Sequence, residues 1–552
     1  MLIYSTILLL LATAVNNNRD SSILFSRMTI LALISSLVVL SINLNLNFIH
    51  EGIILYGGLF MIKSHSLIFI LFILILSIFI VSLNSFHLRK LKDNSPNSKD
   101  LYITMKTVAY KSLQKNLLRK LNMMTYEYRI IEYPLIILFC LTGAIFLLCS
   151  YDIVSIFLSI ELQSYGLYLL CSIYRNSESS INAGLTYFLL GGLSSCVILL
   201  GISLLYVNTG NTNLENIYMI NSIYNASTPN FLNETLNINN IFADVSTEYT
   251  YIQLPLAIMS VGFLFKIGSA PFHFWSPDVY DGIPTIVTTF VAIIAKISIL
   301  ILLYELSFYT DSSIKTWSWL NNIALSSVLS LLIGSILGLI QFRIKRLFAY
   351  STISHIGFIL LALTINTLES SRALFFYIIQ YSLSNLNAFI ILITIGYNLY
   401  FYIFKDNLNI KTDNYSPIQV ISQLKGYFYV NPILAISLSL TLFSFVGIPP
   451  LIGFFGKQMV LLAALDKGYI FISLIGILTS VISAVYYLVL VKVMFFEKSI
   501  YSSTEELYKN QFSPNIISMS SYLSFAISIL TLFILLFMFF DQELIRLVYI
   551  IT

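Results

Sequence analysis

Charged residues are scarce in this chain. Only 10% of its 552 residues are Asp, Glu, Lys or Arg, whereas soluble globular domains carry about 25%. A water-soluble protein is therefore excluded. The formal net charge is +4, and these charges are too few and too dispersed to indicate a nucleic-acid-binding surface.

Cysteine and histidine are also scarce, with four and five copies. The cysteines are Cys140, Cys149, Cys171 and Cys196, which lie in apolar runs and form no Cys-x-x-Cys pair. Iron–sulfur, haem and zinc sites need clusters of such ligands, so the sequence indicates neither these sites nor a flavin site. We expect the chain to bind no cofactor or metal, and the cysteines to be small core residues.

Apolar residues, by contrast, make up 57% of the chain, and its mean hydropathy is +0.85. A helix needs about 20 mostly apolar residues to cross a bilayer, and the sequence contains about fourteen such spans. We therefore predict an all-α polytopic membrane protein, whose first apolar run is a span and not a cleaved signal. The expected spans lie near residues 2–16, 23–46, 66–86, 134–150, 152–173, 181–207, 254–274, 283–306, 319–341, 346–366, 372–402, 432–464, 469–495 and 517–540.

The loops between these spans alternate in charge. Segment 87–130 carries ten Lys and Arg residues, whereas segment 208–250 carries none and has four acidic residues. With fourteen spans these loops lie on opposite sides of the membrane, and the positive-inside rule puts the basic side in the matrix or cytoplasm. Both termini are then expected on the other side. The two loops are weakly periodic, so we expect surface excursions and not folded domains.

Four ionisable residues lie within the expected spans: Glu161, Lys266, Lys296 and Lys457. A charge at the centre of a membrane helix costs about 2.5–3.5 kcal/mol, so such residues usually mark ion or proton pathways. The alternatives are a structural ion pair and a lysine that reaches the interface. One carboxylate cannot neutralise three lysines, and burial disfavours the charged ammonium. These residues are therefore suited to proton exchange.

Two of these lysines lie beside predicted helix breaks. Lys266 precedes Pro271, and Lys457 follows Pro450; proline breaks a helix. One constant offset along the chain aligns both the two prolines and the glycines that precede them. Five spans lead from one break to the other, so the two copies run in opposite directions. We predict two inverted repeats, each with a discontinuous helix, near 254–274 and 432–464.

Several polar residues near these spans allow two interpretations. His355 lies about ten residues into an expected span and is a candidate for relaying protons between the two halves, although a hydrogen-bonded packing histidine is an equal alternative. His273, just after the first break, is expected to line that break. Asp278 and Asp281 lie at a span edge, where a solvated position is as good an interpretation as a role in lining the break. The basic run 343–346 is expected to anchor a helix end.

The run FKIGSAPFHFWSPDVYDGIP (265–284), followed by TTFVAIIAKISIL (288–300), resembles the proton-translocating antiporter-like subunits of respiratory complex I. The resemblance extends over roughly spans 3 to 13, from GIILYGGLF (52–60) to GIPPLIGFFGK (447–457). The spacing Lys-x4-Pro-x-His-x-Trp-x-Pro, with a second lysine in the next span, is highly specific. PDVYDGIP followed by TTF narrows the resemblance to one type of subunit within the family.

The resemblance implies a role for each candidate residue. Glu161 and Lys266 would form the pair whose opening and closing couples to neighbouring subunits, and Lys296 would be the central relay lysine. Lys457 would be the terminal lysine, and His355 would lie on the hydrated axis between the halves. Quinone reduction elsewhere in the complex would then move a proton along this axis by electrostatic repulsion.

The resemblance also implies a setting. The chain would be a subunit of the H⁺-translocating NADH:ubiquinone reductase without a redox centre of its own, because NADH, FMN, iron–sulfur clusters and ubiquinone bind elsewhere in the complex. Its partners would be lipids and other membrane-arm subunits, including neighbouring antiporter-like subunits. The Asn, Ile and Leu bias suits an AT-rich organellar gene, which favours the mitochondrial inner membrane over a bacterial plasma membrane. Lys63 departs from the family pattern, because an acidic residue is expected there.

Two other functions are compatible with parts of this pattern. A cation/proton antiporter of the related family is the main alternative, and sodium-dependent transport would favour it. A subunit that only braces its neighbours is disfavoured by the cost of four in-span charges.

The expected regions are 1–86 (spans 1–3), 87–130 (basic matrix-side loop), 131–306 (first repeat, spans 4–8, with the acidic outer loop 208–250), 319–496 (second repeat, spans 9–13) and 497–552 (last loop and C-terminal span).

Overall fold

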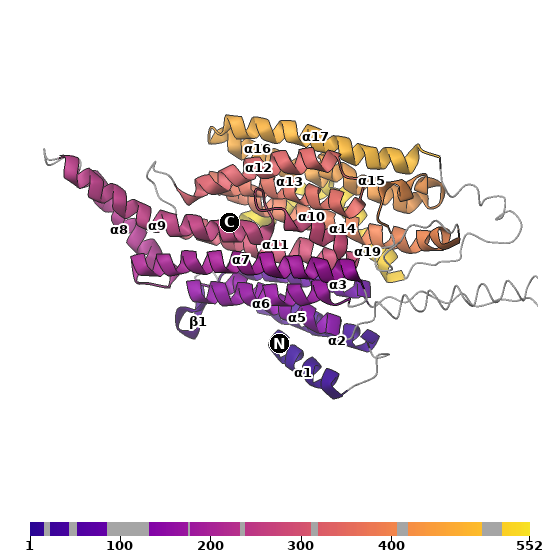
Figure 1. The fold of residues 1–552 in the computed structure, drawn as a ribbon, viewed down its shortest axis with the longest axis horizontal. Coiled ribbons are helices and arrows are strands. Elements are labelled where there is room, and N and C mark those ends of the chain that lie inside the picture. The colour runs from indigo at the N-terminus through magenta and orange to yellow at the C-terminus, as the bar shows by residue number, and fades with distance from the viewer. Residues whose placement is uncertain are drawn as a thin grey trace, which may run out of the picture.

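The computed structural model describes residues 1–15, 22–43, 52–84, 132–174, 177–231, 238–310, 318–405, 418–498 and 521–551. Long helices dominate these residues and form a bundle elongated along the helix direction (Figure 1). Among the described residues, eleven helices are long and apolar enough to cross a membrane, and three shorter apolar helices accompany them. The chain is therefore a polytopic membrane protein, as expected.

The helices follow one another in three groups along the chain. The first group contains α1 (Leu2–Val15), α2 (Ser22–Asn43) and α3 (Ser64–Asn84). The second group contains α5 (Glu132–Cys149), α6 (Ile153–Ser172), α7 (Glu178–Thr209), α8 (Leu214–Phe231), α9 (Ile238–Ile267), α10 (Trp275–Gly282) and α11 (Thr285–Tyr309). The third group contains α12 (Trp319–Leu339), α13 (Ile344–Ile365), α14 (Leu368–Lys405), α15 (Pro432–Val446), α16 (Ile452–Asp466) and α17 (Ile470–Phe495), and α19 (Ser521–Leu535) and α20 (Phe537–Ile551) end the chain.

The centre of the bundle is formed by α11, α13 and α14. The most apolar stretch of α11 is entirely buried, and 94% and 89% of the corresponding stretches of α13 and α14 are buried. In α7 this share is only 28%, and its outward face carries exposed leucines such as Leu185, Leu189 and Leu193. Such a face suits contact with lipid or with neighbouring subunits. Because α11 is central, its side chains can contact both halves of the chain.

Segment 208–250 contains more helix than the sequence suggested. Helix α8 occupies its first part, and α9 begins well before the apolar span. Leu214, Ile217 and Asn221 are buried, and their spacing puts them on one face of α8 that packs against the bundle. Part of this loop is therefore helical and packs against the bundle. The basic loop 87–130 lies entirely outside the described residues.

Two further details differ from expectation. A two-stranded antiparallel hairpin, β1 (Ile53–Leu55) and β2 (Phe60–Ile62), precedes α3, so the described residues are not all helical. Phe60 pairs with Ser150, which ties the hairpin to the link between α5 and α6. Cys196 is exposed on α7, whereas the other three cysteines are buried. The core role expected for the cysteines is therefore wrong at Cys196, because α7 lies at the edge of the bundle.

The chain leaves the helix at both predicted breaks. Helix α9 ends seven residues before α10 begins, and a shorter gap separates α15 from α16. Gly268 and Gly447 follow the two helix ends with φ of +76° and +88°, a conformation that glycine adopts at no steric cost. The amides of Gly268 and Ser269 donate to Leu264, and those of Gly447 and Ile448 donate to Phe443, over 3.0–3.2 Å. The same hydrogen bonds thus close both helices, at the positions that the sequence offset aligns.

Two helix pairs are also built alike, at a slightly larger offset along the chain. A Cβ added to Gly143 of α5 would lie 2.7 Å from the amide nitrogen of Gln163 of α6, and one added to Gly334 of α12 would lie 2.7 Å from that of Ser354 of α13. Glycine therefore lets each pair approach backbone to backbone. The residues that precede α6 and α13 form matching bridges, Asp152 with Asn213 and Arg343 with Val420.

Candidate functional site

The first charged pair joins α6 to the end of α9. The Lys266 ammonium, just before the break, lies 3.5 Å from a carboxylate oxygen of Glu161 and 3.5 Å from the hydroxyl of Tyr168. Both side chains are largely removed from water, so the pair neutralises two charges that would be costly apart. His273, which was expected to line the break, is buried in it with its ring centre 4.7 Å from that of Phe274.

Lys296 lies in the middle of α11 and is 2% exposed. Its ammonium donates to the hydroxyl of Thr352 on α13 at 3.2 Å and lies 5.4 Å from the centre of the Tyr280 ring. In the described part of the chain, no carboxylate lies at ion-pair distance from it. A hydroxyl stabilises an ammonium less than a carboxylate does, and the ring offsets only part of the difference.

His355 lies one turn after Thr352 on α13. Its Nδ1 is 2.9 Å from the Tyr377 hydroxyl of α14, and its Nε2 is 3.4 Å from the Tyr487 hydroxyl of α17. A phenol can donate or accept a hydrogen bond, so both ring nitrogens keep a partner in either tautomer. The buried imidazole therefore connects three helices of the second half through exchangeable protons.

Lys457 lies on α16 and closes the second break. Its ammonium donates to the carbonyls of Phe445 and Val446, at 2.8 Å in each case. These carbonyls end α15 and have no partner within that helix, because the chain turns away at Gly447. The negative end of the α15 dipole also favours a cation at this point. The helix break thus creates the binding site of the lysine.

One face of α13 connects the last three groups. Thr352, His355 and Phe358 recur every three residues and therefore lie on the same side of the helix. Thr352 accepts from Lys296, and the centre of the Phe358 ring lies 5.6 Å from the Lys457 ammonium. Lys457 also acts electrostatically on His355. The structure thus gathers three of the five candidate residues along α13, whereas the first charged pair involves α6 and α9.

Buried polar side chains of α14 lie beside this face. Among the described residues, Oε1 of Gln380 and both amide atoms of Asn387 have no hydrogen-bond partner. A Cβ added to Gly456 would lie 2.9 Å from Oε1 of Gln380, which puts that amide beside Lys457. Buried polar atoms in native proteins are nearly always satisfied by protein or by water. This side of α14 therefore suits a hydrated region.

Asp278 and Asp281 of α10 pair with basic residues at the start of α13. Arg343 donates to Asp281, and Arg346 lies 2.9 Å from Asp278 and 3.2 Å from Asp281. The Lys345 ammonium donates at 2.6 Å to a backbone carbonyl that follows α10. These contacts agree with the expected anchoring role of the basic run. They also give both aspartates a protein partner in addition to solvent.

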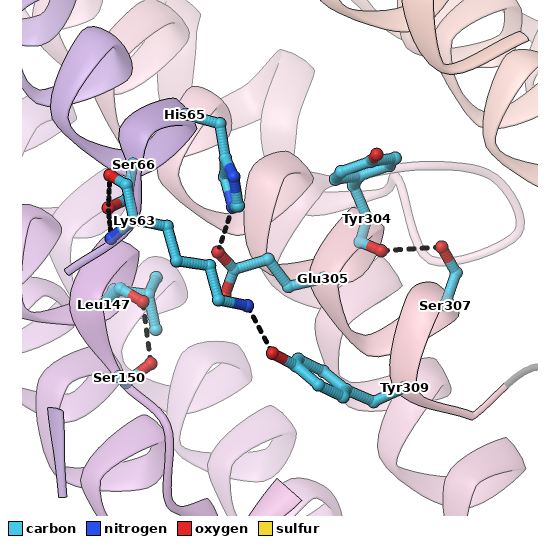
Figure 2. Close-up of polar contacts among 9 residues, drawn as sticks. All are labelled: Lys63, His65, Ser66, Leu147, Ser150, Tyr304, Glu305, Ser307 and Tyr309. Atoms are coloured by element: carbon cyan, nitrogen blue, oxygen red, sulfur yellow. Dashed lines mark hydrogen bonds and ion pairs between the residues drawn. The ribbon is translucent and has the colours of Figure 1, made fainter. Parts of the chain in front are cut away.

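A second set of ionisable residues includes Lys63, which the sequence analysis noted, and three residues that it did not identify. Figure 2 shows Lys63 and His65, from the start of α3, facing Glu305 and Tyr309 near the end of α11. Nε2 of His65 lies 2.9 Å from a carboxylate oxygen of Glu305, and the Lys63 ammonium donates to the Tyr309 hydroxyl. Glu305 falls at the edge of an expected span, where acidic residues are common. The sequence signal that could have identified Glu305 is its apolar surroundings, with ILLY before it and LSFY after it.

Comparisons with known proteins agree with this architecture. Residues 150–483 match the family model described as NADH:quinone oxidoreductase/Mrp antiporter, transmembrane. NADH-ubiquinone oxidoreductase chain 2 of Rhizopus oryzae is 44% identical over 498 residues, which cover 90% of this chain and 86% of that protein. NADH-quinone oxidoreductase subunit N of Rhodospirillum rubrum is 31% identical, over 67% of this chain and 68% of that protein. The resemblance to one type of antiporter-like complex I subunit is thereby confirmed.

Solved structures share the fold over nearly the whole chain. A chain of respiratory complex I from Thermus thermophilus superposes with a TM-score of 0.69 at 23% identity, covering 99% of this chain and 97% of that one. A chain of the Mrp complex from Dietzia sp. superposes with a TM-score of 0.71 at 16% identity, covering 99% and 94%. At these identities the likeness concerns the fold alone.

Proposed function

Because the chain belongs to the NADH:quinone oxidoreductase/Mrp antiporter transmembrane family, we propose that it is a proton-translocating membrane-arm subunit of respiratory complex I. Electron transfer from NADH to ubiquinone elsewhere in the complex drives protons through its buried Glu and Lys residues. The chain itself holds no redox centre. It lies in the mitochondrial inner membrane among other membrane-arm subunits, with both termini on the intermembrane-space side.

The position of Lys296 is the observation that carries this proposal. A purely structural lysine in a membrane protein pairs with a carboxylate or extends to the interface. Lys296 does neither in the described residues, because it lies at the bundle centre and is held by the Thr352 hydroxyl of the other half. An ammonium held by a neutral group releases its proton more easily than one held by a carboxylate. Lys296 therefore suits a relay toward His355.

The Glu161–Lys266 pair supplies the coupling step. Two unit charges about 4 Å apart interact by about 4 kcal/mol in a medium of intermediate polarity, which corresponds to about a thousandfold change in a protonation equilibrium. While the pair is closed, the two charges cancel. When a neighbouring subunit opens it, Lys266 becomes uncompensated and repels the proton on Lys296 toward His355 and Lys457.

The same proposal includes the finer architecture. Fourteen spans, two of them discontinuous, form inverted repeats over 131–306 and 319–496, flanked by regions 1–86, 87–130 and 497–552. The matched hydrogen bonds at the ends of α9 and α15 support it. So do the matched close approaches in the pairs α5–α6 and α12–α13. The two matches occur at different offsets along the chain, as expected of a duplicated unit whose loops differ in length.

Replacement of the relay lysine tests the proposal. Lys296→Met keeps the length of the side chain but removes its exchangeable proton. A positioned proton-transfer group contributes about 10²–10⁴-fold to a rate, so we expect proton pumping to slow at least about a hundredfold. Pumping is measured in inside-out membrane vesicles with NADH, and NADH oxidation by an artificial electron acceptor reports assembly.

The control is Lys492→Met, since Lys492 is exposed in the last turn of α17. It should leave pumping and assembly unchanged. If Lys296→Met vesicles pumped protons as fast as the parent, Lys296 would not be on the path and a bracing role would gain support.

A cation/proton antiporter subunit is the second candidate, favoured by the fold shared with the Mrp complex chain. A native gel of mildly solubilised membranes, stained for NADH dehydrogenase activity and followed by mass spectrometry, separates the two. Stoichiometric presence in the active band supports complex I. Migration apart from that activity, together with sodium-dependent flux in liposomes, supports the antiporter.

A further inference from the structure

A cluster of ionisable side chains lies apart from the proposed proton path, where the start of α3 meets the end of α11 (Figure 2). Lys63 and His65 directly follow the β1–β2 hairpin, and Glu305 and Tyr309 lie in the last turns of α11. The two segments are 240 residues apart in sequence at the His65–Glu305 contact. The fold therefore brings a lysine, a histidine and a carboxylate together from distant parts of the chain.

The contacts of the cluster are specific. His65 Nε2 lies 2.9 Å from Oε1 of Glu305, whose side chain is 7% exposed, whereas that of His65 is 18% exposed. The Lys63 ammonium donates to the Tyr309 hydroxyl and lies 5.6 Å from the centre of the Tyr151 ring. Figure 2 shows the Glu305 carboxylate between the His65 ring and the Lys63 side chain. The buried carboxylate of Glu305 is thus linked to solvent by the partly exposed imidazole of His65.

The remaining titratable neighbours are few. Cys149, at the end of α5, interacts electrostatically with Glu305. Tyr151, between α5 and α6, interacts with Tyr309 and with Glu215 of α8. Imidazole changes its charge between about pH 5 and 8, whereas lysine and tyrosine ordinarily do not. The Glu305 carboxylate contacts His65, whereas the Lys63 ammonium donates to Tyr309, so His65 is the group through which Glu305 can exchange a proton with water.

The cluster and the polar interior lie on the same face of α11. Ser298 and Glu305 are seven residues apart on α11 and so share a face, separated by about 10 Å. The Ser298 hydroxyl exchanges hydrogen bonds of 3.1 and 3.2 Å with the Gln163 amide, two residues beyond Glu161. The two turns between Ser298 and Glu305 are apolar. Proton exchange along this face therefore requires transient water.

The end of α11 that carries Glu305 is the end opposite the α10–α13 ion pairs. It lies on the same side as the hairpin and α8 (Figure 1), and α8 belongs to the segment without basic residues, 208–250. In the proposed topology this is the outer side of the membrane. The cluster thus lies where a proton that has crossed the first half would meet water.

We propose that Glu305 is a proton-exchange site at the outer end of the first half, which passes protons to and from water through His65. The proton moves between Oε1 of Glu305 and Nε2 of His65, and leaves from Nδ1 of the imidazole to water; no other bond forms or breaks. Lys63, held by Tyr309, fixes a positive charge beside the carboxylate and so favours release. This inference rests on the proposed proton-translocating function.

Substitution of Glu305 in the assembled complex tests it. Glu305→Gln keeps the shape and a hydrogen bond to His65 but cannot exchange a proton, so we expect pumping with NADH to slow roughly a hundredfold, the lower end of what a positioned proton-transfer group contributes. Glu305→Asp keeps the carboxylate and should retain most of the activity. Glu369→Gln is the matched control, because Glu369 is an exposed glutamate at the start of α14. NADH oxidation by an artificial acceptor should be unchanged in all three.

The rank order of the variants' pumping rates distinguishes a proton-exchange site from a merely structural contact. A clamp between α3 and α11 would suffer more from the shorter aspartate than from glutamine, so Glu305→Asp slower than Glu305→Gln would overturn the proposal. Normal pumping by an assembled Glu305→Gln complex would also overturn it. Where Glu305→Gln does not assemble, His65→Gln takes its place: a loss of pumping supports the proposal, and an unaltered rate from pH 5 to 8 overturns it.

Lys296→Met, measured in parallel, separates this inference from the proposed function. If Lys296→Met abolishes pumping while Glu305→Gln does not, the relay stands and the exchange site is rejected. If neither variant pumps more slowly, the proposed function itself fails.

Discussion

Each buried lysine of the candidate path is held by a different kind of partner. Lys266 has a carboxylate, Lys296 has a hydroxyl and Lys457 has two backbone carbonyls. Hydrogen bonds to a charged group contribute about 1.5–3 kcal/mol each, more than neutral ones. The three identical side chains therefore lie in different polar surroundings, which are set by the partner and not by the residue type.

The hydrogen bonds of Lys457 to the end of α15 can be weakened by substituting Gly447, which lies beside the lysine side chain. Gly447→Ala puts a Cβ 3.1 Å from Cδ of Lys457 on a residue with φ of +88°, where a side chain costs about 1–2 kcal/mol. We expect a shorter lifetime of the solubilised complex at fixed temperature and slower proton pumping. Both are measured against the parent in detergent and in vesicles.

Gly192→Ala is the control for this substitution. A Cβ at Gly192 meets nothing within 4 Å, and alanine is favoured over glycine in a helix by about 1 kcal/mol. If Gly447→Ala behaved like Gly192→Ala, the left-handed turn would have no influence on the lysine.

The charged residues of the path were predictable from sequence, but their partners were not. Lys296 is recognisable because a cation is rare within an apolar span. Thr352, Tyr377 and Tyr487 are not recognisable, because neutral polar residues are common in such spans and their role depends on which face of α13 meets which helix. Glu305 was missed for a related reason: its position near a span end hides its burial.

Pairs of helices in the two halves approach closely through glycine. We expect Gly334→Ala to separate α12 from α13, because its Cβ would lie 2.7 Å from the Ser354 amide nitrogen and a backbone atom cannot rotate away. The shift would move the face that carries Thr352 and His355. The expected result is a shorter lifetime in detergent and slower pumping, despite the better helix propensity of alanine.

The result is compared with Gly192→Ala, which makes the same chemical change on an open helix face. A Gly334→Ala complex as durable and as active as that control would show that α12 and α13 tolerate separation.

Most membrane helices were located from hydropathy alone, because each apolar run is bounded by polar sequence. Helix α5, Glu132–Cys149, falls within two residues of the expected span 134–150. Helix α8 was missed because its sequence mixes apolar and polar residues and contains no long apolar run. The sequence also could not show that Glu161 and Lys266 would lie 3.5 Å apart, since that distance depends on how α7 packs against both α6 and α9.

The two halves of the molecule are joined at one end by ion pairs between α10 and α13. Asp281 has a side chain 9% exposed and pairs with two arginines, whereas that of Asp278 is 66% exposed and pairs with one. We expect Asp281→Asn to destabilise the solubilised complex by about 2 kcal/mol, within the range for hydrogen bonds to charged groups. Asp278→Asn should cost less than about 1 kcal/mol, as exposed pairs do.

The measurement is the midpoint of thermal inactivation of proton pumping for both variants. Because the two substitutions are chemically identical, equal midpoints would show that burial at the α10–α13 junction contributes nothing. A larger loss for Asp278→Asn would reverse the expected order.

The matched helix pairs have a consequence for the direction of transport. In the proposed inverted repeats, a twofold axis in the membrane plane relates the two copies, so an exactly repeated unit would look the same from either side of the membrane. When α5–α6 is aligned with α12–α13 so that Gly143 meets Gly334, Glu161 coincides with Thr352. Each contacts a lysine, but one copy offers a negative charge and the other a neutral hydroxyl. In the proposed inverted repeats, this mismatch gives the two copies unlike partners for their lysines.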